Sequence, residues 1–434
     1  MNYYIETYGC QMNDYDSLMM AKILNIAGYN RLNSPKDADI IIINTCSVRE
    51  KPQHKVYSAA GRFKRDVNKK VVIAGCVAQQ LGKKILKDLP YIDAVVGTHN
   101  TQRILDIIND INYGKRVVAT DFFDSSDNRF REKFSPPLID GISAFVTIME
   151  GCDNFCSYCI VPYVRGREIS RPHSDILEDI EHLLSNGVKD ITLLGQNVNS
   201  YGNKDSQEWS FVQLIKEIGQ LRDLKRFRFV TSHPKDLSNE VIDVFGTLDN
   251  LVPYLHLPLQ SASDRILNVM NRKYTFSDYL KKIEMLREVR SDISLTTDLI
   301  VGFPGETEDD FRKTIEAMKL IRYDNTFSFK YSPRPFTKSL SFKDSVSEDI
   351  KQERLLELQE LQKVITREKN VEKTGKILEI LVEKVSKKSE NELSGRSGCG
   401  RVVNFKGKKE LIGKLIKVKI IEAYQNSLKG EILE

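Results

Sequence analysis

The 434-residue sequence lacks the marks of a secreted or membrane protein. Its first residues, Met1 to Glu6, contain no basic stretch followed by an apolar segment, which argues against a secretory signal. The longest apolar runs, such as Ile40 to Ile43, are far shorter than the roughly 20 residues that span a bilayer. We therefore expect a cytoplasmic protein without a membrane partner.

The sequence is also poor in cysteine, and its seven cysteines are an odd number. In a reducing compartment, such a set indicates metal ligands or reactive thiols and not disulfides. Hydrophobic residues (41%) and charged residues (29%) are present at ordinary levels, and the length predicts two or three globular domains. The net charge of +5 is too small to indicate nucleic-acid binding by itself. However, residues 371–434 hold 14 Lys/Arg against 9 Asp/Glu, so this tail alone carries a surplus equal to that of the whole chain.

Residues 1–121 predict an α/β domain with a parallel sheet covered on both faces. Apolar, β-branched runs alternate with helical segments, which is typical of βαβ units. The expected strands are Tyr3–Thr7, Ala38–Asn44, Lys70–Ala74 and Asp93–Gly97, and the expected helices are Asp16–Ala27, Pro52–Arg65 and one from Ala78. Residues 122–140 are rich in Ser, Asp, Arg and Pro and predict a linker.

Residues 138–368 predict a (β/α) barrel. Six βα units in about 190 residues are too few for a closed eight-stranded barrel, so we expect an incomplete one. The expected strands are Ala144–Met149, Asp190–Leu194, Arg226–Thr231, Tyr254–Pro258, Ser294–Val301 and Thr326–Tyr331. The expected helices are Asp175–Ser185, Phe211–Leu221, Asn239–Phe245, Ser277–Val289, Glu308–Ile321 and Asp349–Asn370.

Residues 371–434 change character and predict a small β-barrel. Short strands are separated by Gly, Ser and Lys turns without a helical period. The expected strands are Ile377–Val385, Arg401–Phe405, Leu415–Ile421 and Lys429–Leu433.

Cys152, Cys156 and Cys159 form a C-x3-C-x2-C motif just after the first expected barrel strand. Barrel active sites are built at this end of the strands. Three thiolates on one loop can hold three corners of a [4Fe–4S] cluster and leave the fourth iron open to a small ligand. Zinc sites use four protein ligands in separated pairs, and no matching pair lies nearby in the sequence. Burial of the three cysteines as small core residues is the weaker alternative.

The motif resembles the signature of radical S-adenosylmethionine (SAM) enzymes. The resemblance implies that the open iron binds SAM and that Tyr158, before the last cysteine, lies near the adenine; packing at the barrel rim explains Tyr158 equally well. The segment Thr297–Glu306 resembles the fifth-strand segment that flanks the adenine in this superfamily, which implies cofactor contacts for Ile300 and Gly302. A glycine-rich strand end also fits a simple turn.

Cys10, Cys46 and Cys76 each follow the end of an expected parallel strand. In a parallel sheet these ends lie along one edge, where ligands bind, so we expect the three to converge on a second cluster. Gly9 and Gly75 are expected to let the backbone bend beside it. A catalytic Cys–His pair is less attractive, because His54 and His99 have no recognisable nucleophile context.

Together the two triads resemble those of the methylthiotransferases over essentially the whole chain. The segments 8–13, 44–50, 161–168 and 401–405 look most like the branch that modifies dimethylallyladenosine in tRNA. The resemblance implies two [4Fe–4S] clusters, SAM, a tRNA substrate, a C-terminal TRAM module and methylthiolation of adenine carbon 2. It leaves threonylcarbamoyladenosine or a ribosomal-protein aspartate as alternative targets, and a non-catalytic RNA-binding protein as a rival class. We expect a monomer that takes electrons from a donor such as flavodoxin or ferredoxin.

The sequence allows two roles for several basic residues. The tail lysines suit RNA phosphates or simply solubilise strand edges: Lys406, Lys408, Lys409, Lys414, Lys417 and Lys419. The arginines after the cluster loop fit contacts to RNA or cofactor, or salt bridges with Glu168 or Asp175: Arg165, Arg167 and Arg171. Cys399 is expected to be a free thiol. His233 and His256, near barrel strand ends, are expected to pack in the core or at the rim, with lining of the cavity as the weaker alternative.

Overall fold

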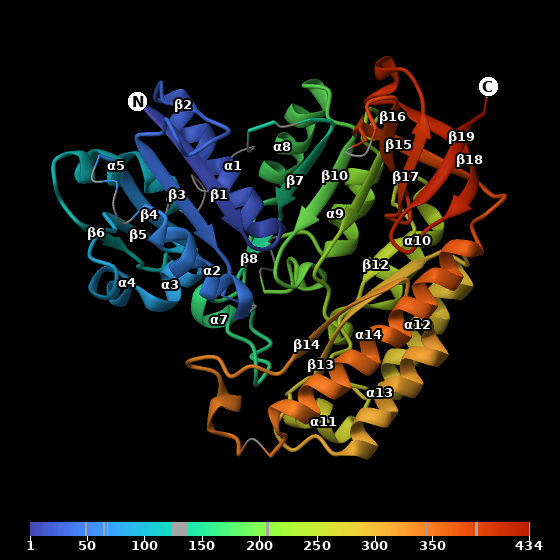
Figure 1. The fold of residues 1–434 in the computed structure, drawn as a ribbon. Coiled ribbons are helices and arrows are strands. Elements are labelled where there is room, and N and C mark those ends of the chain that lie inside the picture. Colours follow the sequence, from blue (N-terminus) through green and yellow to red (C-terminus); the bar gives the residue numbers. More distant parts are fainter. Residues whose placement is uncertain are drawn as a thin grey trace.

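The computed structural model describes residues 1–47, 50–63, 66, 68–123, 138–139, 141–204, 208–343, 345–386 and 389–433, and only the backbone of residues 50–55. Figure 1 shows three bodies in chain order: an N-terminal α/β unit, a central βα unit and a C-terminal barrel. No helix among these residues is long and apolar enough to cross a membrane.

The N-terminal unit is built on a six-stranded parallel sheet in the order β2-β1-β3-β4-β5-β6. The strands are β1 (Asn2–Tyr8), β2 (Asn30–Arg31), β3 (Ile40–Thr45), β4 (Lys70–Gly75), β5 (Ala94–Val96) and β6 (Val117–Ala119). The helices are α1 (Gln11–Ile26), α2 (Glu50–Gly61), α3 (Cys76–Leu81), α4 (Lys83–Asp88), α5 (Ile104–Asn112) and the 3-10 helix η1 (Thr98–Arg103).

Alternate side chains of β3 enter two separate cores, which explains its uninterrupted apolar sequence. Ile40 and Ile42 pack with Leu24 and Ile107 from α1 and α5 on one face of the sheet. Ile41 packs on the other face with residues of α2, α3 and α4. The prediction of a doubly covered parallel sheet is therefore confirmed.

The central unit has six parallel strands in two three-stranded sheets, ordered β11-β10-β7 and β12-β13-β14. A parallel bridge between Phe227 and Leu251 joins the β11 side to the segment before β12. No pairing of β7 with β14 exists among the described residues, so the barrel stays open as expected. One large core fills it. The strands are β7 (Ser143–Thr147), β10 (Asp190–Leu194), β11 (Arg226–Phe229), β12 (Tyr254–His256), β13 (Ser294–Val301) and β14 (Asn325–Lys330).

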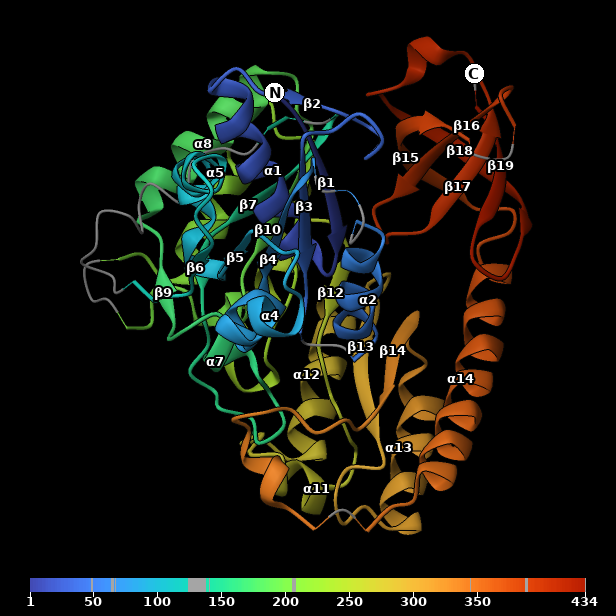
Figure 2. The same ribbon diagram turned by 60° about the vertical axis from the view of Figure 1, so that its left-hand side comes forward.

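The barrel helices lie outside the strands, and the long α14 leads to the C-terminal unit (Figures 1 and 2). They are α8 (His173–Ser185), α9 (Phe211–Gly219), α10 (Asn239–Thr247), α12 (Phe276–Val289), α13 (Glu308–Ile321) and α14 (Glu348–Val371). The C-terminal unit is a closed five-stranded barrel, β15-β16-β17-β19-β18. Its strands are β15 (Ile377–Val385), β16 (Glu392–Ser397), β17 (Val402–Lys406), β18 (Leu415–Ala423) and β19 (Leu428–Ile432).

The C-terminal barrel packs against the starts of the central strands. Arg226 at the start of β11 donates to the carbonyl of Arg396 at 2.8 Å. Arg401 donates to Asp324, the residue before β14, at 2.6 Å. The small barrel therefore sits at the end of the central unit opposite the C-terminal strand ends, as Figure 1 shows.

Several elements depart from expectation. α1 begins at Gln11 and not at Asp16, because Cys10 and Asn13 form a reciprocal cap that needs no apolar periodicity. Short elements without a clear pattern were also missed: β2, β6, β16, the hairpin β8 (Met149–Glu150) with β9 (Ile169–Ser170), α7 (Val161–Val164) and α11 (Asp264–Val269). Most of the expected 122–140 linker and the Arg65 end of the second expected helix lie outside the described residues.

Candidate functional site

Three cysteines of the N-terminal unit meet at the C-terminal edge of its sheet. Cys10 precedes α1, Cys46 directly follows β3, and Cys76 begins α3 after β4. The Cys46 thiol makes hydrogen-bonding contact with both Cys10 and Cys76. The structure thus brings together three residues that are about 30 positions apart in the sequence.

Contact among these thiols separates their pKa values. The hydrogen bonds to Cys10 and Cys76 raise the pKa of Cys46 well above its ordinary value. The same bond from Cys46 lowers the pKa of Cys10 to about 6 and also lowers the pKa of Cys76; burial opposes both shifts, and the Arg165 guanidinium supports them. The triad therefore carries thiolate character near neutral pH, and the thiolate is the form that binds iron.

Two glycines allow close packing around this triad, for different reasons. Gly75 has a φ of +89°, and a Cβ there would meet the Asn44 side chain at 2.3 Å and the Thr45 carbonyl oxygen at 2.6 Å. Gly9 is required by space alone, because its Cβ would meet the Asn13 side chain at 2.3 Å. Only Gly75 shows the sharp bend expected from the sequence.

The second triad lies on the loop between β8 and α7. Cys156 is buried, while Cys152 and Cys159 are partly exposed. The loop is fixed by backbone bonds from Cys152 N–H to the Gly166 carbonyl (3.3 Å) and from Cys159 N–H to the Cys156 carbonyl (2.9 Å). Burial raises the pKa of Cys152 to about 11 and that of Cys159 higher still. These two thiols therefore stay protonated near neutral pH unless a cation such as iron binds them.

Both triads fit a cubane cluster better than a single metal ion. Among the described residues, no three His, Cys, Asp or Glu side chains are arranged to hold one ion. In a cubane, each thiolate holds a different iron atom, so the three sulfur atoms need not converge on one point. A donor set of three thiols without a histidine or carboxylate partner is the set that such clusters use.

Two buried side chains face Cys156. The Nη1 of Arg272 lies 3.5 Å from the Cys156 Sγ and 3.5 Å from the Tyr158 hydroxyl, and its Nη2 donates to the Pro258 carbonyl at 2.7 Å. His233 places Nε2 4.0 Å from the same sulfur. Because His233 Nδ1 accepts the N–H of Lys235, its proton resides on Nε2, and burial lowers the pKa of His233 far below its ordinary value. A neutral N–H donor and a fixed cation therefore flank this cysteine.

A buried ion cluster joins the two cysteine triads. Arg165, which follows α7, binds Asp16 of α1 at 2.6 Å and Glu150 of β8 at 3.1 Å, and all three side chains are at most 3% exposed. Beside it, Cys76 packs against Ile160 and Val164, and Ile160 directly follows Cys159. Thr98 and His99 of η1 bond the carbonyl oxygens of Val164 and Arg165. Figure 1 accordingly shows α7 beneath the C-terminal ends of β1 and β3.

This ion cluster decides one of the alternatives left open by the sequence. Arg165 forms salt bridges, although with Asp16 and Glu150 and not with Glu168 or Asp175. Arg171 likewise binds Asp179 at 2.8 Å. Arg167 binds Asp153 at 2.6 Å but is 71% exposed, so both alternatives stay open for it.

The three residues expected near the cofactor adenine lie close together. Tyr158 and Ile300 border one apolar cluster formed by Ile266, Met270, Phe303 and Tyr331. Gly302 directly follows β13, the strand that contains Ile300, and has a φ of +70°. A Cβ at Gly302 would meet Lys351 Cγ at 2.2 Å, so packing against α14 alone already demands a glycine there.

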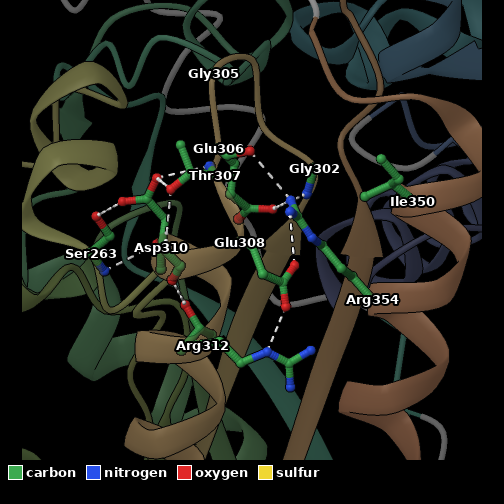
Figure 3. Close-up of polar contacts among 12 residues, drawn as sticks. Ser263, Gly302, Gly305, Glu306, Thr307, Glu308, Asp310, Arg312, Ile350 and Arg354 are labelled. Atoms are coloured by element: carbon green, nitrogen blue, oxygen red, sulfur yellow. Dashed lines mark hydrogen bonds and ion pairs between the residues drawn. The ribbon is translucent and has the colours of Figure 1, made fainter.

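A buried carboxylate holds the backbone at Gly302 (Figure 3). The Gly302 N–H donates to Glu306 Oε2 at 2.6 Å, and Arg354 of α14 donates to the same oxygen at 2.9 Å. Burial raises the pKa of Glu306 to about 7, against the opposing effect of the Gly302 N–H and Arg354. Asp310 accepts from Ser263 and Thr307 and so caps α13 beside this loop.

The expected RNA-contacting lysines lie far from the cysteines along the fold. Lys406, Lys408, Lys409 and Lys414 are exposed on the C-terminal barrel, and no ion pair links them to another described residue. That barrel packs at the opposite end of the central strands from the cluster loop. A cavity of about 290 Å³ between the first two units is lined by Thr7, Asp14, Ser17, Arg31 and Phe145 among others, but by none of the cysteines.

Two further candidate residues, His256 and Cys399, make local hydrogen-bonding contacts. His256 bonds Thr296 at 2.9 Å, and Cys399 contacts Ser397 and Arg401. The side chain of His54 is outside the described part of the structure. Sequence reasoning missed Arg272, Asp16 and Glu150, and only Glu150 stands in an otherwise apolar and cysteine-rich context that could have signalled it.

Comparison with known families divides the chain into the same three parts. Residues 2–97 match the uncharacterized protein family UPF0004, residues 146–318 match the radical SAM superfamily, and residues 371–433 match the TRAM domain. Among solved structures, the radical SAM methyltransferase TsrM from Kitasatospora setae, with cobalamin and a [4Fe-4S] cluster bound, covers 78% of this chain and 73% of its own (TM-score 0.57, 14% identity). The cobalamin-dependent radical enzyme OxsB covers 83% and 56% (TM-score 0.52, 12% identity). The chain is thus a radical SAM protein with a C-terminal TRAM domain.

Curated relatives identify the family within this class of radical SAM proteins. The tRNA-2-methylthio-N(6)-dimethylallyladenosine synthase of Syntrophus aciditrophicus is 49% identical over 99% of this chain and 94% of its own. The protein of the same name from Geobacter sulfurreducens is 48% identical over 99% and 97%. The chain therefore belongs to the family of tRNA-2-methylthio-N(6)-dimethylallyladenosine synthases.

Proposed function

We propose that this protein attaches a methylthio group to carbon 2 of N6-dimethylallyladenosine next to the anticodon of tRNA. The reaction requires removal of an unactivated hydrogen from the adenine and delivery of sulfur to the same carbon. One observation carries the proposal beyond family membership: Cys76 of the first triad packs on Ile160, the neighbour of Cys159 in the second. Two sulfur-rich sites side by side suit a reaction in which both steps occur at one atom.

We assign each triad to one [4Fe–4S] cluster. Cys152, Cys156 and Cys159 would hold the cluster that binds SAM, with Tyr158, Ile300 and Gly302 around the adenine; Cys10, Cys46 and Cys76 would hold the second. When bound, these groups supply a carbon radical and a sulfur atom. The protein's own residues position them: Arg165 ties α1 to the loop after α7, and Glu306 holds the Gly302 backbone.

The remaining assignments concern organisation and partners. We take residues 1–121, 138–368 and 371–434 as the three domains. Lys406, Lys408, Lys409 and Lys414 would contact tRNA phosphates, since they are exposed cations on the TRAM barrel. The protein would act in the cytoplasm as a monomer and receive electrons from a flavodoxin or ferredoxin.

Nucleoside analysis of tRNA from cells that lack the gene tests the proposal directly. The methylthio nucleoside should disappear while N6-dimethylallyladenosine accumulates. A plasmid with the wild-type gene or with Cys399→Ser should restore it, because Cys399 belongs to neither triad, whereas Cys46→Ala should not. An unchanged nucleoside profile, or loss of a modification on threonylcarbamoyladenosine instead, would overturn the assignment.

A further inference from the structure

Three exposed aromatic side chains gather at the barrel rim beside the cluster loop. Phe155 lies between Cys152 and Cys156, Tyr163 is on α7, and Phe336 follows β14. Their ring centroids are 6.2 Å apart for Phe155–Tyr163 and 6.1 Å for Tyr163–Phe336, and the latter pair is tilted by only 35°. They are 37%, 38% and 60% exposed. We call these three residues the rim aromatics.

The backbone at two of the rim aromatics is in the left-handed region. Phe155 has a φ of +45° and Phe336 a φ of +69°. A bulky residue rarely adopts this conformation, and its strain is usually offset by burial or tolerated for function. Phe336 remains 60% exposed, so burial within this chain does not offset it. Strain that presents an aromatic ring to solvent indicates a ligand for that ring.

The charges around the rim aromatics are those of a site for an anionic polymer. The Arg167 guanidinium lies 5.0 Å from the centre of the Phe155 ring; its Nε pairs with Asp153, and the side chain is 71% exposed. Lys338, two residues after Phe336, is exposed. Lys273 is also exposed and follows Asn271, whose amide donates to the Phe155 carbonyl at 3.0 Å. Aromatic rings interleaved with exposed cations are the means by which proteins bind single-stranded nucleic acid.

The position of the TRAM barrel leaves these contacts to other parts of the chain. That barrel packs at the starts of the central strands, whereas the rim aromatics lie at their C-terminal ends. An eight-residue strand such as β13 is about 26 Å long, so lysines on the barrel cannot contact bases held at the cluster loop. Contacts to those bases must come from residues near the cluster loop, and the rim aromatics are exposed there.

We propose that Phe155, Tyr163 and Phe336 form a stacking platform for unpaired bases of an RNA loop that flank the modified adenosine. This inference rests on the proposed function. The bases lie on the ring faces while Arg167, Lys273 and Lys338 contact the phosphates. The platform selects an open loop over a paired stem, because bases within a helix have no free face to offer.

Binding of an anticodon stem-loop RNA that carries N6-dimethylallyladenosine tests the platform, measured anaerobically by fluorescence anisotropy on the reconstituted protein. Phe336→Ala and Tyr163→Ala should each weaken binding by about 5- to 150-fold, the range for loss of one stacked base. Phe336→Tyr, which keeps a ring, should stay within about threefold of wild type. Leu340→Ala is the matched control, since Leu340 is 55% exposed and apolar in the same segment but has no ring; it should bind as wild type does.

Iron content per chain, measured for every variant, separates loss of binding from loss of the folded cluster loop. Wild-type affinity in Phe336→Ala would overturn the platform, and would mean that the rim serves another partner. Equal weakening by Leu340→Ala would also overturn it, because a general apolar contact would then suffice. Neither result depends on which nucleoside the wild-type protein modifies, so failure of the platform is distinguishable from failure of the proposed function.

Discussion

Replacing Arg165 with methionine should loosen the junction between the first two domains. Methionine has a similar length but no charge, so Asp16 and Glu150 lose the guanidinium that they share at 2.6 and 3.1 Å. All three side chains are at most 3% exposed, and Asp16 Oδ1, the oxygen that Arg165 does not bind, has no hydrogen bond among the described residues. Removing one partner of a buried ion pair costs about 3–5 kcal/mol, because the other charge stays buried without compensation.

The expected effect is large enough to measure by thermal unfolding. For a cooperative unit of 150–250 residues, each kcal/mol lowers Tm by about 2–4 °C, so Arg165→Met should lower it by about 6–20 °C. Arg167→Met is the matched control: Arg167 is 71% exposed and its ion pair with Asp153 is on the surface, so its Tm should change by no more than about 4 °C.

A triple variant isolates the cause of the loss. Adding Asp16→Asn and Glu150→Gln to Arg165→Met removes the two charges that faced the guanidinium and should recover part of the lost Tm. If Arg165→Met melts within about 2 °C of wild type, the buried ion cluster does not hold the domains together. If the triple variant is less stable than Arg165→Met, the loss comes from packing and not from charge.

Three further predictions concern Glu306, Arg272 and Cys399. The pKa of Glu306 is about 7 in the folded chain and 4.5 without burial, so between these pH values the folded state binds more protons than the unfolded state. Stability should therefore fall as pH rises from about 4.5 to about 7, and Glu306→Gln should flatten this part of a Tm-against-pH curve. Arg272→Met removes a cation near Cys156, and it should lower the reduction potential of a cluster held by this loop by on the order of 100 mV in an EPR-monitored titration. An unchanged potential would contradict the assignment of that cluster to Cys156. Cys399→Ser should leave the iron content unchanged and the Tm within about 2 °C of wild type. A loss of iron would show that Cys399 is a cluster ligand.

Sequence patterns were sufficient for elements whose burial is periodic or continuous. β10, β13, β15 and α13 begin and end where expected, because most of their apolar residues enter a core, although Leu320 and Ile377 are exposed. β16 escaped detection because its Ser, Gly and Arg residues carry no alternation, although a closed barrel needs it. The cap at Cys10 is likewise a local hydrogen-bonding device without hydrophobic signal.

The cysteines could be found from the sequence, whereas their surroundings could not. Strand ends in a parallel sheet must share an edge, so Cys10, Cys46 and Cys76 could be placed together from spacing alone. Arg272 reaches Cys156 from 116 positions away, and Asp16 reaches Arg165 from 149. Contacts of this kind depend on how separately folded units pack, which no local pattern encodes.

The most direct test of two clusters on two triads is iron quantitation with Mössbauer spectroscopy on two triple variants. Wild type should hold about eight iron atoms per chain, and replacement of Cys10, Cys46 and Cys76 by alanine should leave about four. That variant should still cleave SAM to 5′-deoxyadenosine but should attach no methylthio group. The variant with alanine at Cys152, Cys156 and Cys159 should keep about four iron atoms and cleave no SAM. A first variant that retains all of its iron, or that still modifies tRNA, would contradict the account.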